Sequence, residues 1–553
     1  MIYNSPFSCP DTEFAALPDL VRGAAARAPD RPALIDAASG ATVTYATLAA
    51  RIGRVAAGLA QRGFAPGDVL AVRAPNIPPW AGVALGAMAA GGTVTGISPL
   101  ATARETAAQL TDAGASVLVT LPSLAEESRA AAAATPVRDV VVVGDAQETA
   151  GSSETPAVTP IGGLLASQAP APGITADPKH VALLPYSSGT TGLPKGVMLT
   201  HASLTAAARQ LVRALGLTPR DRFLALAPFA HVMGFAVSLS APLAVGAAVV
   251  TLPRYDLPAL LSAIERYRVT VIAVPPPAFA ALARDPVADG YDLSSLELIA
   301  SGGASLSPEL HEAMAARFPG AAVGQGYGLT ETTAVISLPA RAANVPGSAG
   351  RIAAGTQVRL VDPATSRDTA PGGPGELWVR GPQVMAGYLG QPQATAADLD
   401  PDGWLRTGDV ARIDAHGNVF ITGRLKELIK VNAYQVAPAE LEALLASHPG
   451  VADVAVIPRP DERAGQVPVA VIVPRGTLSP DALIAWVTER VAPHKRIRAV
   501  QLASQIPRTP SGKILRRILI EEDQGAAGRP AAPAPAAKCP VPNPGKAAPA
   551  SGS

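Results

Sequence analysis

The amino-acid sequence predicts an α/β protein whose sheets are largely parallel. Short apolar runs typical of strands alternate with longer amphipathic patterns typical of helices through the first 120 residues. This alternation is the pattern of parallel strands joined by helices. The chain has 553 residues, of which 48% are hydrophobic. It can therefore bury a large core, but it is too long for a single ordinary core, and we expect at least two domains.

The N-terminal elements are expected in a regular order. Residues 15–65 are predicted to form helices around a short hairpin, whose two strands are separated by a Ser-Gly turn. Thr44 then precedes an amphipathic pattern that starts at Leu48 and indicates a helix. The expected strands are 32–36, 41–45, 68–73, 92–98 and 116–120, and the next expected helices are 80–90 and 105–113. We assign these elements to the support of the fold and none of them to chemistry.

The rest of the chain predicts three further kinds of segment. Residues 146–178 are rich in Ala, Pro, Thr, Ser and Gly, which is typical of a surface connection. Residues 345–420 are rich in strand-like runs punctuated by Gly and Pro, and they predict a small barrel-like part. After residue 423, helical and strand patterns predict an α+β domain. The other expected elements are helices at 202–215, 438–445 and 483–491 and strands at 221–227, 247–252, 269–274, 296–304, 451–457 and 467–473.

Composition disfavours several classes of function. The net charge is +1 and 16% of the residues are charged, so no attraction to nucleic acid or to a membrane surface is expected. Cys9 and Cys539 lie near opposite ends, so we expect no disulfide framework and a reducing, cytoplasmic location. The sequence contains no cluster with zinc-ligand spacing, and we expect neither a signal peptide nor a membrane span. Ala and Pro make up 17 of the 30 residues of 524–553, which predicts a disordered tail.

The most informative stretch is 184–201, Leu-Pro-Tyr-Ser-Ser-Gly-Thr-Thr-Gly-Leu-Pro-Lys-Gly-Val-Met-Leu-Thr-His. Its glycines allow backbone N–H groups to turn toward a ligand, and its hydroxyls and lysine complete a site suited to a polyphosphate. It is not a Walker loop, because Lys195 follows Pro194 and precedes Gly196. A short Gly/Ser/Thr loop alone would be a flexible turn, but the whole stretch favours phosphate binding. The predicted contacts are Ser187, Ser188, Gly189, Thr190, Thr191, Gly192 and Lys195.

This stretch resembles the phosphate loop of the adenylate-forming superfamily, which contains acyl-CoA synthetases, peptide-synthetase adenylation domains and luciferases. The resemblance runs from roughly residue 10 to 522 and is greatest to the 4-coumarate–CoA ligase branch. It implies a large domain, 1–423, of two α/β sheet subdomains and the barrel-like part. It also implies a smaller mobile α+β domain, 424–523, with a hinge near Lys426, before the tail at 524–553.

The resemblance also implies a two-step reaction. A carboxylate attacks the α-phosphate of ATP and releases pyrophosphate, and the thiol of coenzyme A then takes the acyl group from AMP. A second motif, Gly324-Gln-Gly-Tyr-Gly-Leu-Thr-Glu-Thr-Thr333, would serve the first step. Tyr327 would offer its ring face to adenine, Thr330 would bind the α-phosphate, and Glu331 would supply a hard oxygen to Mg²⁺. The further residues expected to bind ATP or AMP are Gly303, Ala304, Gln325 and Gly326.

Charged residues from later motifs would complete the catalytic site. Asp409 would accept hydrogen bonds from the ribose hydroxyls, with Arg424 as a second ribose contact. From charge alone Lys513 would be a solvated surface lysine, but the resemblance identifies it as the catalytic lysine of adenylation. A positioned ammonium that meets charge developing on the α-phosphate contributes about 3–4 kcal/mol in comparable sites. Lys430 and Gln435 match residues that approach the adenylate or the thiol.

His231 lies in an apolar stretch, where a lone histidine is more often a satisfied core residue than a catalyst. The resemblance instead implies that it gates and positions ligands between the acyl pocket and the thiol tunnel. The substrate pocket is expected to contain His231, Met233, Val237, Gly302, Gly326, Ala334 and Val335. The expected contacts with coenzyme A are Arg254, Asn432 and Ala433. For Arg254, a solvated surface arginine is an equally simple interpretation.

Two places depart from the plant-type 4-coumarate ligases. Met233 and Val237 stand where those enzymes have Tyr and Ser. Because an apolar pocket gives little reward for a hydroxyl, we expect an acid with an unhydroxylated far end, such as cinnamate, another aryl acid or a medium-chain fatty acid. The second departure is Asn432-Ala433, where the ligases usually have Lys-Gly. This change makes a carrier-protein thiol an alternative acceptor to coenzyme A.

Three other functions remain alternatives at the level of sequence. Transfer of the acyl group to the phosphopantetheine of a carrier protein keeps the first step and changes the second. A luciferase-like oxygenase also differs only in the second step and would require oxygen. A non-catalytic nucleotide sensor is disfavoured because the catalytic groups are present, namely Thr330, Glu331, Asp409, Lys430 and Lys513.

Overall fold

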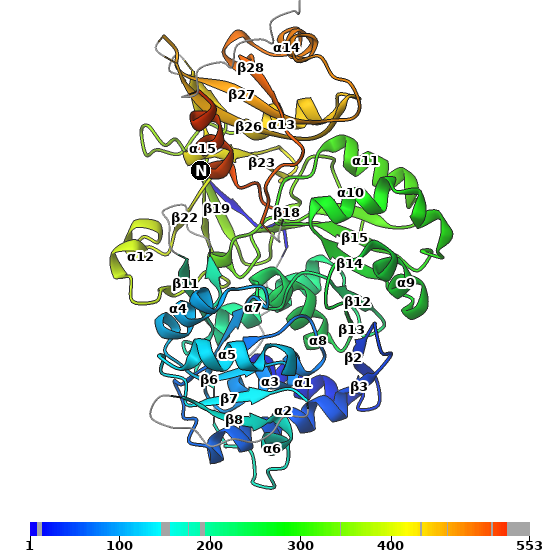
Figure 1. The fold of residues 1–553 in the computed structure, drawn as a ribbon, viewed down its shortest axis with the longest axis vertical. Helices are drawn as coiled ribbons and strands as arrows, with labels where there is room; N and C mark the ends of the chain where they lie inside the picture. The colour runs from blue at the N-terminus through cyan, green and yellow to red at the C-terminus, as the bar shows by residue number, and fades with distance from the viewer. Residues whose placement is uncertain are drawn as a thin grey trace, which may run out of the picture.

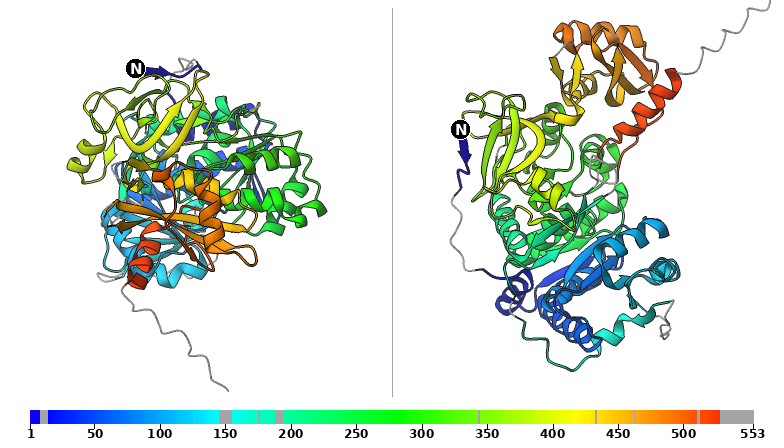
Figure 2. Two further views of the ribbon diagram at one scale, coloured as in Figure 1. Left: turned by 90° about the horizontal axis from the view of Figure 1, so that it is seen from above. Right: turned by 90° about the vertical axis from the view of Figure 1, so that its left-hand side faces the viewer.

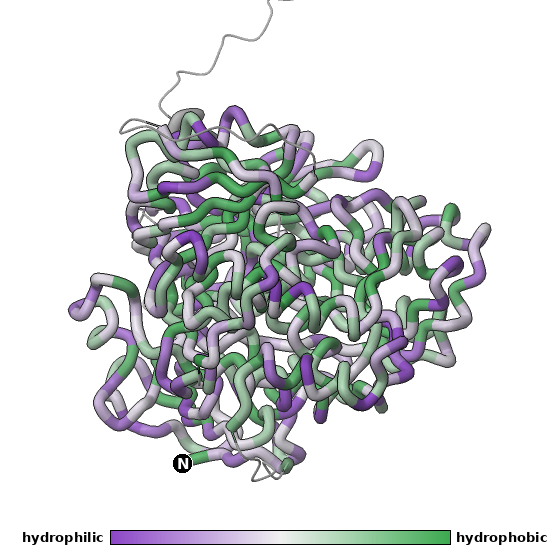
Figure 3. Tube along the Cα trace, turned by 90° about the horizontal axis from the view of Figure 1, so that it is seen from below, coloured by the Kyte–Doolittle hydropathy of each residue, from purple (hydrophilic) through white to green (hydrophobic). Residues whose placement is uncertain are grey.

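A computed structural model describes residues 1–7, 14–144, 155–174, 176–187, 194–342, 344–431, 434–461, 463–509 and 512–527. Its sheets and helices confirm the predicted α/β class. Two large sheets and one antiparallel sheet form the lower and middle parts of the molecule in Figure 1, and a small C-terminal part lies above them. In the Cα trace of Figure 3, hydrophobic segments are frequent in the interior of the molecule, and hydrophilic segments lie mostly at its periphery.

The first sheet carries the predicted phosphate loop at one edge. Its order is β10-β11-β9-β5-β4-β6-β7-β8, with β21 also paired to β11. The strands from β4 to β8 pair in parallel, while β10, β11 and β21 pair in antiparallel fashion. The strands are β4 (Val69–Arg73), β5 (Thr93–Ile97), β6 (Ala115–Thr120), β7 (Asp139–Val142), β8 (Ala157–Pro160), β9 (Val181–Leu183), β10 (Tyr186–Ser187), β11 (Lys195–Thr200) and β21 (Gly387–Tyr388).

Helices cover both faces of this sheet. Buried residues of α2 and α3 pack on one face in the main hydrophobic core, and residues of α4 and α5 pack on the other. The helix α2 begins where the sequence predicts, because the Thr44 side chain accepts a hydrogen bond from the Thr47 N–H. The helices of this part are α1 (Leu17–Arg27), α2 (Tyr45–Gln61), α3 (Pro79–Ala89), α4 (Ala103–Ala113), α5 (Ala125–Ala132), α6 (Ile161–Leu165) and α7 (His201–Ala214).

The second sheet has the order β16-β15-β14-β12-β13-β2-β3 and is parallel except for its β2–β3 hairpin. One face packs on α9, α10 and α11, and the other shares the main core with the first sheet. The strands are β2 (Pro32–Asp36), β3 (Thr42–Thr44), β12 (Arg222–Ala225), β13 (Ala248–Thr251), β14 (Val271–Val274), β15 (Leu298–Ser301) and β16 (Ala322–Gln325). The helices are the π-helical segment η2 (Met233–Ser240), α8 (Ala241–Val245), α9 (Leu257–Tyr267), α10 (Pro276–Arg284) and α11 (Pro308–Arg317).

The third sheet is antiparallel and has the order β1-β19-β20-β22-β23. Figure 2 shows the N-terminal strand along one side of it, distant in sequence from its partner. The strands are β1 (Ile2–Asn4), β19 (Gln357–Val361), β20 (Gly375–Arg380), β22 (Leu405–Ile413) and β23 (Val419–Arg424). Nearby are the pair β17 (Ser337–Leu338) and β18 (Arg351–Ile352) and the helix α12 (Pro392–Asp398).

The C-terminal part has a hydrophobic core of its own and follows the short helix η5 (Leu425–Glu427). Its sheet has the order β25-β24-β27-β26, with β28 beside β27. The strands are β24 (Ile429–Val431), β25 (Tyr434–Val436), β26 (Val451–Asp461), β27 (Gly465–Pro474) and β28 (Ala499–Leu502), and the helices are α13 (Pro438–Ala446), α14 (Pro480–Thr488) and α15 (Arg516–Ala527). The remaining short helical segments are η1 (Pro122–Leu124), η3 (Pro286–Gly290), η4 (Thr330–Thr332) and η6 (Pro493–Lys495).

Two expectations are corrected by these elements. The segment 146–178, expected as a surface connection, contains β8 and α6, because Thr159 and Leu164 are buried against the first sheet and its helices. Residues 524–527, expected as the start of a disordered tail, instead belong to α15, and the rest of that tail lies outside the described residues. Among the described helices, none is long and apolar enough to cross a membrane.

Candidate active site

The ends of the predicted phosphate loop lie side by side in a hairpin. Tyr186 pairs with Gly196 and Ser187 pairs with Lys195. The ammonium of Lys195 lies 4.5 Å from the centroid of the Tyr388 ring. The described ends of the loop therefore place a serine and a lysine opposite each other across the hairpin. The other predicted contacts, Ser188, Gly189, Thr190, Thr191 and Gly192, lie outside the described residues.

Small residues follow the carboxyl ends of the neighbouring parallel strands β15 and β16. The N–H of Gly326 donates to the carbonyl of Ser301 at 2.9 Å, which holds the two strand ends together. The side-chain oxygen of Gln325 accepts from the N–H of Leu306 at 2.8 Å and fixes the following turn. Gly303 adopts a φ of 84° there and is solvent-exposed, and Ala304 is half-buried. Ligands of α/β sheets bind at this kind of strand end.

A hydrogen-bonded cluster forms around the Asp409 carboxylate. The Tyr327 hydroxyl donates to one Asp409 oxygen at 2.7 Å, and the Arg424 Nε donates to the other at 2.7 Å. Asp409 and Arg424 are direct partners across β22 and β23, whereas Tyr327 reaches the cluster from the loop after β16. Asp409 is only 2% exposed. The carboxylate is therefore held in one orientation, and its remaining lone pairs can accept hydrogen bonds from hydroxyl groups.

The charge state of this cluster follows from its burial and its partners. Burial and the Asp409 carboxylate both raise the pKa of Tyr327, so the phenol keeps its proton. Burial opposes the charge on Arg424, but Asp409 outweighs it and raises the pKa of the guanidinium. The cluster therefore contains one anion, one cation and one neutral donor.

The backbone after the second motif is strained. Thr333 and Ala334 adopt φ values of 50° and 67°, which are unfavourable for residues other than glycine and cluster at functional sites. The Thr333 hydroxyl donates to the carbonyl of Gln383 at 2.8 Å and stabilises this turn. Thr330 and Glu331, in η4 before it, are both half-buried. The turn thus presents a hydroxyl and a carboxylate on one short segment.

The Glu331 carboxylate fits a Mg²⁺ ion that is bound together with phosphates. One of its oxygens accepts a hydrogen bond from the Tyr388 hydroxyl at 3.1 Å. Within the described part of the chain, no group of three or more His, Cys, Asp or Glu residues could hold a metal by itself. Mg²⁺ commonly uses one or two carboxylates and completes its shell with substrate phosphates and water. A site with Glu331 as its carboxylate therefore suits a magnesium–nucleotide complex.

The C-terminal part brings Lys513 to the nucleotide-site residues. The Thr509 N–H donates to the Lys513 carbonyl at 2.8 Å, and the Lys513 N–H donates to the Thr509 hydroxyl at 3.1 Å. At Gly512, a Cβ atom would lie 3.5 Å from the Cβ of Pro275 and 3.3 Å from the Cδ of Pro277. The loop thus lies against the start of α10.

Electrostatics also connect Lys513 with the Asp409 cluster. Burial lowers the pKa of the Lys513 ammonium, and the positive charge of Arg424 lowers it further. Asp409 and Glu427 act in the opposite direction. The ammonium is therefore partly desolvated among charged groups, where it can act strongly on a developing negative charge.

Predicted acyl-pocket residues lie close together. A Cβ atom at Gly302 would lie 3.3 Å from the Met233 Cε and 3.9 Å from the Gly326 carbonyl oxygen. The Met233 N–H donates to the Nδ1 of His231 at 3.3 Å. His231 keeps solvent access, yet enough protein surrounds the ring that burial lowers its pKa. Its neutral form is therefore favoured at pH 7. Val237 and Val335 are buried, and Ala334 is half-buried.

The residues predicted for the thiol half of the site lie on the C-terminal part and on one loop. Lys430 on β24 is exposed and pairs in register with Gln435 on β25. Lys426 lies in η5 and is also exposed. Arg254 is exposed in the loop after β13. Asn432 and Ala433 lie outside the described residues.

Two residues of the site were missed by the sequence analysis. Tyr388 contacts both Lys195 and Glu331. The Asn76 side chain donates to the carbonyls of Ala225 and Ala227 and accepts from the Phe229 N–H, which fixes the backbone that leads to His231. The sequence around these residues offered little to identify them. Asn76 follows a predicted strand, and Tyr388 follows Ala386-Gly387.

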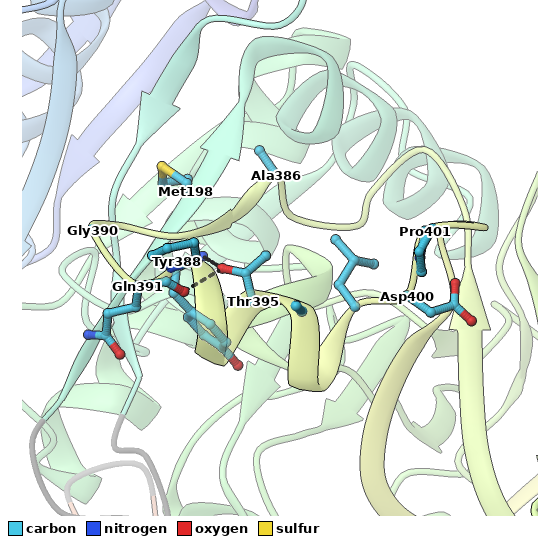
Figure 4. Close-up of a pocket in the computed structure, with 11 residues that line it drawn as sticks. Met198, Ala386, Tyr388, Gly390, Gln391, Thr395, Asp400 and Pro401 are labelled. Carbon is cyan, nitrogen blue, oxygen red and sulfur yellow. Dashed lines mark hydrogen bonds between the residues drawn. The ribbon is translucent and has the colours of Figure 1, made fainter.

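A cavity of about 530 Å³ lies beside α12 rather than among the nucleotide-site residues. Tyr388 borders both places. Figure 4 shows Tyr388, Gln391 and Thr395 joined by hydrogen bonds along one side of the cavity. Its other walls are largely apolar. The lining residues include Met198, Ala386, Leu399 and Pro401.

Comparisons with known proteins match most of the chain. The family model described as AMP-binding enzyme matches residues 21–389, and the model of the AMP-binding enzyme C-terminal domain matches residues 440–513. A 4-coumarate–CoA ligase of Oryza sativa subsp. japonica is 39% identical over 513 residues, which cover 90% of each chain. A peroxisomal OPC-8:0-CoA ligase of Arabidopsis thaliana is 38% identical and covers 89% of this chain and 90% of its own. The solved structure of the anthranilate–CoA ligase AuaEII in complex with anthranoyl-AMP is 26% identical, with a TM-score of 0.84, and covers 93% of this chain and 98% of its own.

Proposed function

This chain belongs to the AMP-binding enzyme family, and from that premise we propose that it is an ATP-dependent acid–CoA ligase located in the cytoplasm. It adenylates a carboxylic acid and transfers the acyl group to coenzyme A, with release of pyrophosphate and AMP. The proposal is supported by the electrostatic interaction of Lys513 with Asp409 and Arg424, and by the hydrogen bonds that Arg424 and Tyr327 donate to Asp409. A nucleotide sensor would need the cluster but would have no use for a lysine delivered by a second domain.

The nucleotide is bound by residues from three parts of the large domain. The Asp409 carboxylate, fixed by Tyr327 and Arg424, accepts hydrogen bonds from the ribose hydroxyls. The turn after β15 and the Tyr327 ring bind adenine, because small residues allow a flat group to approach the backbone. Ser187 and Lys195 bind the phosphates together with the rest of their loop.

The first step joins the acid to AMP. A carboxylate oxygen of the substrate attacks the α-phosphorus, and the bond from phosphorus to the bridging oxygen of pyrophosphate breaks. Negative charge increases on the α-phosphate oxygens, where the Lys513 ammonium and the Thr330 hydroxyl stabilise it. One such preorganised donor contributes about 3–4 kcal/mol. Mg²⁺, held through Glu331, supplies charge neutralisation to the phosphates.

The second step requires the C-terminal part to move. The thiol sulfur attacks the acyl carbon, the bond to the AMP oxygen breaks, and the thiol proton leaves to solvent. In the described arrangement the Lys513 loop lies against the start of α10, and we infer that η5 acts as a hinge at Lys426 and withdraws this loop. Lys430, Gln435 and the loop with Asn432 and Ala433 then approach the site, and Arg254 binds coenzyme A.

The acid is proposed to have an apolar far end. Met233 and Gly302 are neighbours and Val237 is buried in η2, so none of them offers a hydrogen bond to a phenolic hydroxyl. An apolar pocket discriminates between acids that differ by one small group by only about 1–3 kcal/mol. We therefore propose cinnamate, another aryl acid or a medium-chain fatty acid as the substrate, with 4-coumarate no better than cinnamate.

A panel of acids tests the proposal. Cinnamate, 4-coumarate, benzoate and C6–C12 fatty acids are each supplied with ATP, Mg²⁺ and coenzyme A, and pyrophosphate and thioester are measured separately. One acid that yields both products in equal amounts supports the ligase. Pyrophosphate with little thioester would direct the search to a carrier protein, and oxygen-dependent turnover to an oxygenase. ATP binding without pyrophosphate for any acid would contradict the proposal.

A matched variant tests the acid specificity. The double substitution Met233→Tyr and Val237→Ser restores the polar groups of the plant-type ligases. We expect it to raise the ratio of kcat/KM for 4-coumarate over cinnamate by roughly 10-fold, because one hydrogen bond contributes a net of about 0.5–1.5 kcal/mol. A strong preference of the unmodified enzyme for 4-coumarate would contradict the assignment.

A further inference from the structure

Tyr388 is fixed between the two segments that are proposed to bind the triphosphate. Its strand β21 pairs with β11, so that Tyr388 lies opposite Val197, two residues after Lys195. The N–H of Leu389 donates to the Gly196 carbonyl at 2.9 Å. The N–H of Met385 donates to the Glu331 carbonyl at 2.9 Å. One short segment is therefore bonded through its backbone to both the lysine strand and the carboxylate turn.

The Tyr388 side chain contacts the same two segments. The ring is only 5% exposed, and the Lys195 ammonium lies over it at 4.5 Å from the centroid. Such a cation–π contact favours one position of the ammonium. The hydroxyl lies 3.1 Å from a Glu331 oxygen and 2.9 Å from an Asp398 oxygen at the end of α12. Ring and hydroxyl thus act on two different functional groups.

The phenol can serve both carboxylates only in turn. The Tyr388 hydroxyl has a single proton to donate, and carboxylate oxygens of both Glu331 and Asp398 lie within hydrogen-bond distance of it. A donor with one proton and two acceptors can release one acceptor without being left unpaired. Glu331 can therefore turn an oxygen toward a cation while the Tyr388 hydroxyl donates to Asp398.

We propose that Tyr388 is a positioning residue that holds the Glu331 carboxylate and the Lys195 ammonium in the geometry that binds Mg²⁺·ATP. The inference rests on the proposed function, because it concerns the same site. Tyr388 lies outside the sequence motifs that predict the nucleotide site, and its role follows from its contacts in the structure. Partners of a metal-ligating carboxylate commonly change metal affinity by about 10–100-fold when they are removed.

The test compares ATP binding with and without metal, in the absence of any acid so that no reaction occurs. The quantity measured is the ratio of the Kd for ATP in EDTA to the Kd for ATP with saturating Mg²⁺, obtained by calorimetry on the full chain. Tyr388→Phe keeps the ring under Lys195 and removes only the hydroxyl. We expect it to reduce this ratio by about 10-fold, while the Kd in EDTA changes by less than about twofold.

Two controls separate positioning from a general effect on the fold. Tyr45 is another buried tyrosine, whose hydroxyl donates to the carbonyls of Leu243 and Ala247. Tyr45→Phe removes an equally buried hydroxyl and should lower Tm without changing the ratio. Glu331→Gln should reduce the ratio, and adding Tyr388→Phe to it should have little further effect, because both changes disturb one interaction.

The outcomes distinguish this inference from the proposed function. If the unmodified chain shows no tightening of ATP binding by Mg²⁺, the proposed function fails. If the unmodified chain shows tightening and Tyr388→Phe shows the same ratio, only the role of Tyr388 is overturned. A Tyr388→Phe protein that fails to fold would show that the hydroxyl serves the fold and would also overturn it.

Discussion

At the scale of single residues, the charged groups of the candidate site differ in how firmly their neighbours fix them. Asp409 accepts hydrogen bonds at both oxygens, from Tyr327 and Arg424, so the orientation of its carboxylate is fixed before a ligand binds. Lys513 differs, because it is carried by a loop of another part of the molecule and its ammonium interacts electrostatically with Arg424, Glu427 and Asp409. The binding groups are thus rigid and the proposed catalytic group can be removed.

This difference predicts the effect of Lys513→Ala. We expect acid-dependent pyrophosphate release to fall by roughly 10²–10³-fold, the usual effect of removing one preorganised donor, because the charge on the α-phosphate loses its partner. Thioester formation from a synthetic acyl-AMP should change by less than about threefold. Arg517→Ala is the matched control, since Arg517 is exposed and pairs only with Glu521 among the contacts described. Equal loss in both half-reactions would contradict the assignment of Lys513 to the first step.

A second residue-scale prediction concerns His201, at the start of α7. Burial lowers its pKa to about 4, and the stacked ring of His180 lowers it while Asp19 and Asp177 act in the opposite direction. The unfolded chain therefore binds a proton near pH 6.5 that the folded chain does not bind until about pH 4, so acid favours unfolding in this window. The loss amounts to about 3 kcal/mol at about 1.4 kcal/mol per pKa unit.

Denaturation by urea at several pH values measures this effect. His201→Gln cannot titrate, so we expect its stability to fall less steeply than that of the unmodified protein between pH 6.5 and 4. The two curves should run parallel above pH 7. His416→Gln is the control, because His416 is exposed, and its curve should follow the unmodified protein throughout. A His201→Gln curve that is parallel at all pH values would contradict the prediction.

The sequence identifies those site residues whose functional groups are clustered within a few positions of one another. The loop at 184–201 and the motif at 324–333 each combine several functional groups within a few positions. Tyr388 could not be identified, because its partner Glu331 lies 57 positions away. Asn76 acts on a backbone 153 positions away. Contacts across such separations depend on the packing of two elements and leave no local pattern.

At the scale of elements, the π-helical segment η2 shapes the proposed acyl pocket. It begins at Met233 and carries Val237, and π-helical turns are rare and often mark functional sites. Its start depends on Gly234, where a Cβ atom would lie 2.0 Å from the Pro228 carbonyl oxygen. Backbone atoms cannot move aside as a side chain can. The segment therefore has a position that only glycine can occupy.

Two glycine substitutions are expected to have opposite consequences. Gly234→Ala should lower the free energy of unfolding by at least about 2 kcal/mol, since overpacking against backbone forces the chain to shift. At Gly302, the nearest atom is the flexible end of Met233, at 3.3 Å from an added Cβ. Gly302→Ala should therefore fold normally and raise KM for the acid several-fold, with KM for ATP unchanged. Thermal unfolding and steady-state kinetics measure both, and a folded Gly234→Ala with unchanged Tm would contradict the argument.

Strands and helices with clear periodicity were predictable, and the exceptions have physical reasons. The helix α2 and the strands β4, β5 and β6 have the expected type and place. The run 233–240 is mostly apolar apart from Ser238 and Ser240, and its pattern does not distinguish a π-helix from other buried segments. The strand β8 lies in a segment of turn-forming residues and is stabilised by pairing with β7, a contact that composition does not reveal.

At the scale of the whole molecule, the position of the C-terminal part is what the sequence predicts least. The Pro-rich loop with Lys513 and the run Pro275–Pro277 carry no pattern that relates them, yet they meet at Gly512. The right-hand view of Figure 2 shows the C-terminal part above the large part. The chain enters the C-terminal part after β23, through η5. We interpret the described arrangement as the one that forms the acyl-adenylate.

A disulfide across this contact would lock the arrangement. An ideal Cβ at Gly512 lies 3.5 Å from the Pro275 Cβ, within the about 3.5–4.5 Å that a disulfide requires. Gly512 has a φ of 86°, so a cysteine there costs about 1–2 kcal/mol of strain. The variant is Gly512→Cys with Pro275→Cys, made after Cys9→Ser and Cys539→Ser so that no other thiol competes. Gly512→Cys without its partner measures the effect of the strain alone.

The locked enzyme should separate the two half-reactions. When oxidised, it should still release pyrophosphate in a single turnover, because Lys513 is held at the site. Its thioester formation should fall by at least about 10²-fold, because the locked C-terminal part blocks the entry of the thiol. Misplacing reacting groups slows a reaction on this scale. Dithiothreitol should restore thioester formation to the level of the single variant. If the oxidised and reduced enzymes form thioester equally fast, the C-terminal part need not move away from the large part between the two steps. Coenzyme A must then reach the adenylate past Lys513.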